Sequence, residues 1–239
     1  MNTYRMNAVM AGVLYFLGTV FGVLGAVIGG EVLVSIISGK PLAGVDILGL
    51  VAANSSRLTG GAFLTLMMGI SLVAMTVFLY PIFRKDSKEL ALGMVLFRGA
   101  LEGTFYFVTT LNILTLVAVG NEYIATGADS AVLQSMGNVL YQFENLKAPV
   151  SSIIFLIGAT CIYLTFYRTR LIPRWLSVWG FIAVATSMAS ALLLFFHIDT
   201  GYGFYLEMVM FPQEIVMAVW LIVKGFNPST IAALSAKTE

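Results

Sequence analysis

Five polar residues recur at helical spacing inside a long hydrophobic run, residues 90–119. They are separated by four, four, three and three positions, and they are Arg98, Glu102, Tyr106, Thr109 and Asn112. An α-helix places residues at this spacing on one face. Such a face is costly in contact with lipid, because ionisable groups at membrane depth are unfavourable unless they are paired or hydrated. We therefore expect the face to line a polar cavity inside the protein.

A second hydrophobic run, residues 203–226, carries two further carboxyl groups, Glu207 and Glu214. They are seven positions apart and would share one face of a continuous helix. Pro212 lies between them and predicts a kink, because proline cannot donate the backbone hydrogen bond. Counting along the runs places Glu214 near the membrane midplane and Glu207 nearer the outer surface, where it could act as a relay.

The deep groups have unequal charge: Arg98 is matched by two carboxyl groups, Glu102 and Glu214. An arginine stays charged and can neutralise one of them. The other must be protonated, bind a cation or contact water. The alternative is a structural network that ties two spans together, with the spare carboxyl group neutral and hydrogen-bonded.

The composition is that of an integral membrane protein. The 239 residues are 59% hydrophobic and 10% charged, whereas a soluble domain has roughly 25% charged residues. The net charge of +1 gives no indication of a nucleic-acid partner. The chain has one histidine, His197, and no CxxC, HExxH, phosphate-loop or dinucleotide motif. We therefore predict no metal, no cofactor and no catalytic residue; these absences favour a protein that is not an enzyme but leave an enzyme open.

Six runs are long and apolar enough to cross a membrane as helices. The predicted fold is an all-α six-helix bundle in one integral membrane domain, residues 1–239. The predicted spans are residues 8–29, 60–83, 90–114, 149–167, 175–196 and 203–223. Residues 130–146 have apolar side chains at helical spacing and predict an outer amphipathic helix, lying on the membrane surface or capping the bundle. The apolar side chains are those of Val132, Leu133, Met136, Val139, Leu140 and Phe143.

The basic residues predict the orientation. With both termini in the cytoplasm, the outer side has Lys40, Arg57 and Lys147. The inner side then has nine basic residues, which are Arg5, Arg84, Lys85, Lys88, Arg168, Arg170, Arg174, Lys224 and Lys237. Because positive residues concentrate on the cytoplasmic side, this orientation is favoured.

Three short motifs resemble a bacterial membrane family, the domain-of-unknown-function family numbered 4386. The first is Gly44-Val45-Asp46 with Asn54 and Arg57 in an outer segment. The second surrounds Arg98 and Glu102, and the third is the sequence LIPRWLSVWG at residues 171–180. The resemblance extends from Gly12 to about Phe226, except that residues 121–142 depart from the family pattern. It implies a six-span protein of the bacterial cytoplasmic membrane without an assigned reaction. It also implies importance for Asp46, Asn54, Arg57, Arg98 and Glu102.

Glycines at helical spacing in the first span indicate a close-packing face, within the bundle or against a second protein. They are Gly18, Gly22, Gly25 and Gly29.

Three functions stay open. The first is binding or transport of a small solute, cation or proton in the polar cavity, which would hold a small polar or amphiphilic ligand. The second is an accessory subunit (sensor, regulatory or immunity protein) that contacts a partner or a second copy through the glycine face. The third is an enzyme that modifies a lipid or quinone.

Overall fold

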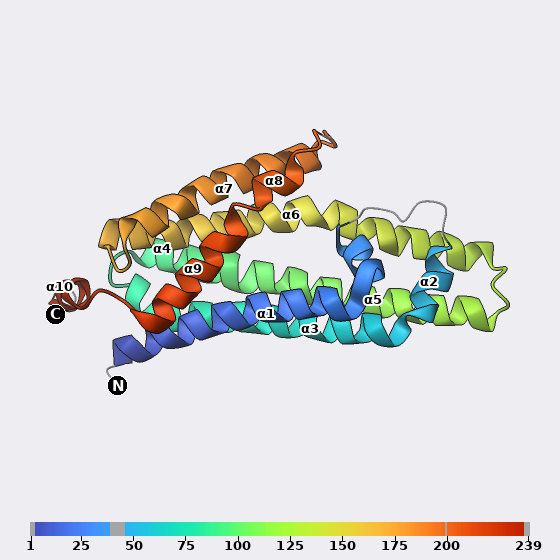
Figure 1. Cartoon of the computed structure of the whole chain (residues 1–239), viewed down its shortest axis with the longest axis horizontal. Helices are drawn as coiled ribbons and strands as arrows, with labels where there is room; N and C mark the ends of the chain where they lie inside the picture. The colour runs from blue at the N-terminus through green and yellow to red at the C-terminus, as the bar shows by residue number, and fades with distance from the viewer. Residues whose placement is uncertain (1–2, 39–45, 199, 237–239) are drawn as a thin grey trace. The chain divides into compact units, whose positions relative to one another are not determined.

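The computed structural model describes residues 3–38, 46–198 and 200–236, and these residues form helices joined by short turns (Figure 1). No strand occurs within these three ranges. In chain order the elements are α1 (Thr3–Ser38), α2 (Ile47–Ala53), α3 (Ser55–Phe83), α4 (Lys88–Met94), the π-helix η1 (Val95–Leu101), α5 (Glu102–Ala125), α6 (Ala131–Thr169), α7 (Arg174–Phe195), α8 (Gly203–Glu207), α9 (Met210–Val223) and α10 (Pro228–Ala236). The predicted all-α fold is confirmed.

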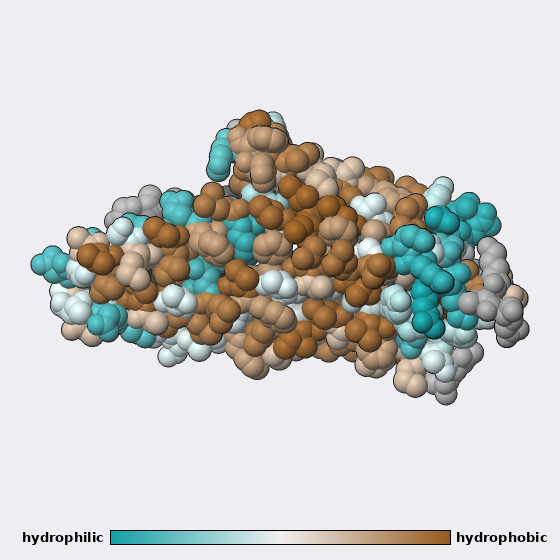
Figure 2. Space-filling model, turned by 180° about the vertical axis from the view of Figure 1, so that it is seen from behind, coloured by the Kyte–Doolittle hydropathy of each residue, from teal (hydrophilic) through white to brown (hydrophobic). Residues whose placement is uncertain are grey.

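Among the described residues, six helical stretches are long and hydrophobic enough to cross a membrane, and each overlaps one predicted span. They are Thr3–Ser38, Ser55–Phe83, Lys88–Ala125, Ala131–Thr169, Arg174–Phe195 and Tyr205–Val223. Hydrophobic side chains cover much of the surface in Figure 2, as expected for helices that face lipid. The chain is a multi-pass membrane protein.

Several helices are longer than the predicted spans. The amphipathic segment 130–146 is helical as predicted, but it forms the first part of α6 rather than a separate helix. α6 continues through Pro149, because an internal proline removes only one backbone hydrogen bond and membrane helices tolerate it. The sequence signal at Pro149 therefore marks no helix boundary.

The last span is interrupted just before Pro212. α8 ends at Glu207 and α9 begins at Met210, so the chain turns at residues 208–209. Pro212 is the third residue of α9, where the backbone N–H has no intrahelical acceptor and its absence costs little. The break agrees with the predicted kink, because proline disrupts a helix at the residue four positions before it, which is Met208 here.

The chain divides into two compact units, which are described separately. Unit 1 consists of Met1–Thr19, Ile70–Gly103 and Val150–Glu239, and unit 2 of Val20–Gly69 and Thr104–Pro149. Unit 1 has a small apolar core of Leu156, Ala183, Ala191 and Met210. Unit 2 has a larger one that includes Leu33, Ile36, Leu58, Ile113 and Leu116. The single domain over residues 1–239 stays a prediction.

Within unit 1, the two ends of the chain are tied together. The hydroxyl groups of Tyr4 in α1 and Ser235 in α10 are 3.2 Å apart. Lys85 Nζ donates to Ser235 Oγ at 3.2 Å and lies 5.4 Å from the centre of the Tyr4 ring. The start of α1 and the end of α10 therefore lie at the same end of unit 1.

The predicted glycine face packs inside the chain. In unit 1, a Cβ on Gly18 would meet Leu72 of α3 at 2.9 Å. In unit 2, a Cβ on Gly22 would meet Met68 at 3.0 Å, and one on Gly25 would meet the Gly61 carbonyl at 3.5 Å. The fourth glycine, Gly29, faces a side chain of α1 itself. These contacts leave the face little room for a second protein.

Candidate functional site

The candidate site is a buried group of charged and polar side chains in unit 1, centred on Arg98. Arg98 is the fourth residue of the π-helix η1, and only 3% of its side chain is exposed. π-Helical turns are rare and occur frequently at functional sites. We call Tyr15, Arg98, Glu102 and Glu214 the charge cluster.

Two carboxyl groups share the Arg98 guanidinium group. Nη1 pairs with Glu102 Oε1, and Nη2 lies 3.4 Å from Glu214 Oε1. The two glutamates differ in exposure, since 4% of the Glu102 side chain and 19% of the Glu214 side chain are accessible. Within the described residues of the charge cluster, one positive charge therefore faces two carboxyl groups, in the grouping that the sequence predicts.

Tyr15 of α1 links the arginine to the second glutamate. Arg98 Nη2 donates to the Tyr15 hydroxyl oxygen at 3.2 Å, and that hydroxyl donates to Glu214 Oε1 at 2.5 Å. Sequence reasoning missed Tyr15. The available signal was its position three residues before Gly18, on the predicted close-packing face, where a buried hydroxyl group needs a partner.

Aromatic rings and close helix packing fix the guanidinium group. Its Cζ lies 4.4 Å from the centre of the Phe155 ring and 5.4 Å from that of Tyr15, which are cation–π distances. α6 packs closely against η1 at Gly158, where a Cβ would lie 2.6 Å from the Arg98 backbone nitrogen. A side chain at position 158 would therefore displace the backbone that carries Arg98.

A neutral hydrogen-bond chain positions Glu214. Its neighbour Gln213 is fully buried in α9 and accepts a 2.6 Å hydrogen bond from the Tyr163 hydroxyl of α6. Gln213 Nε2 in turn donates to the Leu176 carbonyl of α7 at 3.2 Å. The oxygen and the nitrogen of the Gln213 amide are thus both hydrogen-bonded inside the protein, which fixes the position of α9 along its axis. Glu214, the next residue, is thereby held beside Arg98.

Glu207 lies apart from the charge cluster. It is exposed at the end of α8 and accepts a 2.9 Å hydrogen bond from Ser190 Oγ of α7. Glu207 and Glu214 would share a face only on one continuous helix. The chain breaks at residues 208–209, so this condition is not met. The structure thus brings Arg98, Glu102 and Glu214 together and leaves Glu207 outside.

Unit 2 contains a second buried ionic group, whose charges balance. Glu144 of α6 is fully buried, and its Oε2 lies 2.7 Å from Lys147 Nζ. Asn112 donates to Glu144 Oε1 at 3.2 Å, and Thr109 donates to Oε2 at 3.3 Å. Lys147 also contacts the Thr109 hydroxyl. Since both carboxylate oxygens and the ammonium group have partners, this group is suited to hold α5 against α6.

The predicted polar face of the third span is therefore divided. Arg98 and Glu102 belong to the charge cluster of unit 1, and Asn112 belongs to the balanced pair of unit 2. Tyr106 is half-buried in unit 2 and packs against Gly69, where a Cβ would lie 2.7 Å from it.

Sequence reasoning missed Glu144. The apolar stripe of residues 130–146 indicates the opposite side of the helix as the packing face. The signal that could have located Glu144 is the spacing of Gly137, Tyr141 and Glu144, four and three positions apart, which all face the interior.

The predicted outer residues do not converge on one site. Asp46 is exposed before α2 and makes no capping bond with its side chain, and Asn54 Nδ2 donates to the Leu50 carbonyl at 2.9 Å. Arg57 Nε donates to the Ile28 carbonyl at 2.9 Å. The other motif residues of this segment, at positions 44 and 45, lie outside the described residues.

Arg57 supports a break in α1 at Gly30. The backbone of Gly30 has φ 67° and ψ −164°, a conformation that is essentially restricted to glycine. A Cβ at this position would also lie 2.9 Å from Arg57 Nη2. A structural role therefore accounts for Arg57, which bonds a carbonyl oxygen beside the break.

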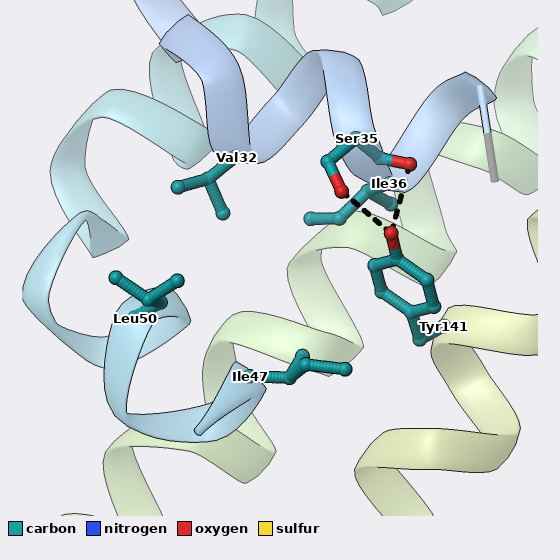
Figure 3. Close-up of a pocket in the computed structure, with 6 residues that line it drawn as sticks. All are labelled: Val32, Ser35, Ile36, Ile47, Leu50 and Tyr141. Carbon is teal, nitrogen blue, oxygen red and sulfur yellow. Dashed lines mark hydrogen bonds between the residues drawn. The ribbon is translucent and has the colours of Figure 1, made fainter. Parts of the chain in front are cut away.

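A small cavity in unit 2 offers no comparable chemistry (Figure 3). Its lining is mostly apolar, and the Tyr141 hydroxyl there is 2.5 Å from Ser35 Oγ and donates to the Ser35 carbonyl at 3.1 Å. The space admits about one water molecule. It is lined by Val32, Ser35, Ile36, Ile47, Leu50 and Tyr141.

No metal centre is evident in the part of the chain that the structure describes. Within it, no three His, Cys, Asp or Glu side chains are placed to hold a metal ion. The chemistry available at the charge cluster is therefore that of two carboxyl groups, one guanidinium group and one phenol.

Comparison with protein-family models identifies a family that covers most of the chain. Residues 10–225 match the model described as a domain of unknown function, DUF4386. Comparisons with curated proteins and with solved structures find no match. All four residues of the charge cluster lie within the matched range.

Proposed function

The chain belongs to the DUF4386 family, and we propose that it binds and transports a proton or small cation at the charge cluster. The observation that carries this proposal is the sharing of one guanidinium group by Glu102 and Glu214. The pair of Glu144 and Lys147 differs from the charge cluster, because its one negative and one positive charge neutralise each other and leave no carboxyl group in need of a proton or cation.

In this proposal, Glu214 is the carboxyl group that binds and releases the proton or cation. Glu102 makes the closer contact with Arg98 and is the less exposed of the two, so it neutralises the arginine. Glu214 is then the carboxyl group in excess, and a buried carboxylate without its own positive charge is unfavourable. A bound proton or cation on Glu214 removes this cost, and its greater exposure gives the ion access.

Tyr15 couples the occupancy of Glu214 to the helices around it. When Glu214 is ionised, it attracts Arg98 and accepts the Tyr15 hydroxyl group. When Glu214 binds a proton or cation, that attraction weakens and Arg98 pairs with Glu102 alone. Changes in occupancy therefore alter the contacts among α1, η1 and α9, which is the kind of change that a transport cycle requires. Glu207 as an outer relay stays a prediction.

We place the protein in the bacterial cytoplasmic membrane with both termini in the cytoplasm. The excess of basic residues at the connections 84–88 and 168–174 supports this orientation. The hydrogen bond between Tyr4 and Ser235 is consistent with it, because it brings the start of α1 and the end of α10 to the same side. Lys40 and Lys237, which enter the charge count, lie outside the described residues.

Flux into liposomes tests the proposal. Purified protein would be reconstituted with a pH-sensitive dye inside, and proton uptake would be driven by a potassium diffusion potential. Sodium and lithium would be tested with the corresponding indicators. We expect flux through the wild type and its loss in Glu214→Gln. Glu122→Gln, which removes an exposed carboxyl group, is the matched control and should keep the flux. Wild-type flux equal to that of empty vesicles for all ions would refute transport.

A further inference from the structure

The first part of α6 has an apolar stripe whose side chains are exposed and are not covered by the described part of the chain. Its five side chains are between 40% and 70% exposed, and they are those of Val132, Met136, Val139, Phe143 and Leu146. Their spacing of four, three, four and three is a 3.5-residue repeat, which is typical of helices that pair along a seam. We call these five residues the seam.

The seam faces away from the core of unit 2. The opposite face of α6 presents Gly137, Tyr141 and Glu144, which are all buried. Beside the seam, the remaining exposed surface consists of polar uncharged side chains such as Ser135, Asn138 and Gln142. A helix surrounded by lipid would be apolar across the whole exposed arc, whereas a narrow apolar seam with a polar rim is the pattern of a protein interface.

The length of α6 separates the seam from the membrane interior. α6 has 39 residues, which corresponds to about 58 Å at about 1.5 Å per residue. About 20 residues cross a hydrocarbon layer of about 30 Å. Because α6 is continuous with the fourth span, its first part cannot lie flat on the membrane surface while the rest crosses it. The seam therefore extends beyond the hydrocarbon layer, which differs from the predicted surface helix.

We propose that the seam pairs with the seam of a second copy of this chain, forming a parallel dimer outside the hydrocarbon layer. Two copies in one membrane share the same orientation, so a twofold axis along the membrane normal aligns their α6 helices in parallel. Residues 131–146 contain one charged side chain, Glu144, and it is fully buried away from the seam. Identical copies can therefore approach without repulsion between like charges. This proposal is independent of the proposed transport function.

Disulfide crosslinking tests the proposal. In a Cys161→Ser background, Val139→Cys places a thiol at a position that meets its own counterpart in a parallel pair. Mild oxidation in membranes should shift this variant to twice its mass on a non-reducing gel, and reduction should reverse the shift. Asn138→Cys is the matched control, because it is exposed beside Val139 but off the seam, and it should stay monomeric.

A second measurement does not depend on introduced thiols. Wild type in detergent should elute as a dimer in size-exclusion chromatography with light scattering, and Val139→Glu should elute as a monomer. Equal crosslinking at positions 138 and 139 would overturn the proposal, since it would reflect random collision. A monomeric wild type without crosslinking at position 139, or a crosslink to a protein of different mass, would overturn it as well.

Discussion

The same substitution should have very different effects at the two carboxyl groups that share Arg98. Glu102→Gln removes the closer partner of a guanidinium group that is 3% exposed. Breaking a buried ion pair costs about 3–5 kcal/mol, and Glu214, which is farther from Arg98 and more exposed, replaces Glu102 only in part. At about 1 kcal/mol per 2–4 °C for a chain of this size, the apparent Tm should fall by roughly 6–20 °C.

Glu214→Gln should have a much smaller effect. At 3.4 Å, the attraction between Glu214 and Arg98 is about 5 kcal/mol at an effective dielectric constant of about 20. The desolvation of an excess carboxylate is also several kcal/mol and opposes it, as does repulsion from Glu102. Glutamine keeps an oxygen that accepts the Tyr15 hydroxyl group. We therefore expect a change in the free energy of unfolding within about 1 kcal/mol.

Thermal unfolding at neutral pH, followed by tryptophan fluorescence in one detergent, would compare the two variants. Glu122→Gln, at an exposed position, controls for loss of a carboxyl group and should leave the apparent Tm unchanged. Equal destabilisation by Glu102→Gln and Glu214→Gln would refute the reasoning. Both carboxylates would then be ionised counterions of Arg98, and the charge cluster would be a structural network.

Three further substitutions test other parts of the structure. Tyr15→Phe removes the hydroxyl group between Arg98 and Glu214 and should cost about 1–3 kcal/mol, measured by thermal unfolding, and reduce liposome flux. Glu144→Gln leaves Lys147 without its carboxylate and should cost about 3–5 kcal/mol, yet flux per folded protein should persist; loss of flux in the folded variant would contradict a purely structural role. Gly30→Ala introduces a Cβ where φ is 67° and Arg57 is close, and it should lower the apparent Tm, whereas Gly127→Ala at an open turn should lower it less.

The hydrophobic runs predict the six spans because lipid forces each of them to be helical. The same constraint brings Arg98, Glu102 and Glu214 to a common depth, so their grouping could be predicted from position alone. Tyr15 could not be identified in this way, because tyrosine is common in apolar helices and its partner lies almost 200 positions away in sequence.

The surroundings of each helix face were harder to predict than the helices themselves, for a physical reason. An apolar stripe indicates a face that avoids water, but it does not say whether that face meets the core, lipid or another protein. In residues 130–146 the stripe is divided: Leu133 and Leu140 pack against the core of unit 2, whereas Val132, Met136, Val139 and Phe143 are exposed. The most buried side of this segment carries Glu144. Pro212, by contrast, predicts the position of the break, because proline disrupts the turn that precedes it.

The π-helix makes the charge cluster a mechanical element as well as an electrostatic one. A π-helical turn contains about one residue more than an α-helical turn. Relaxation of one such turn to α-helix would rotate α4 about its axis by about 100° and move it by about 1.5 Å relative to Glu102. α4 starts directly after the basic connection at residues 84–87. A change in the pairing of Arg98 would thereby reach this end of unit 1 as a screw motion, without bending any of the long helices.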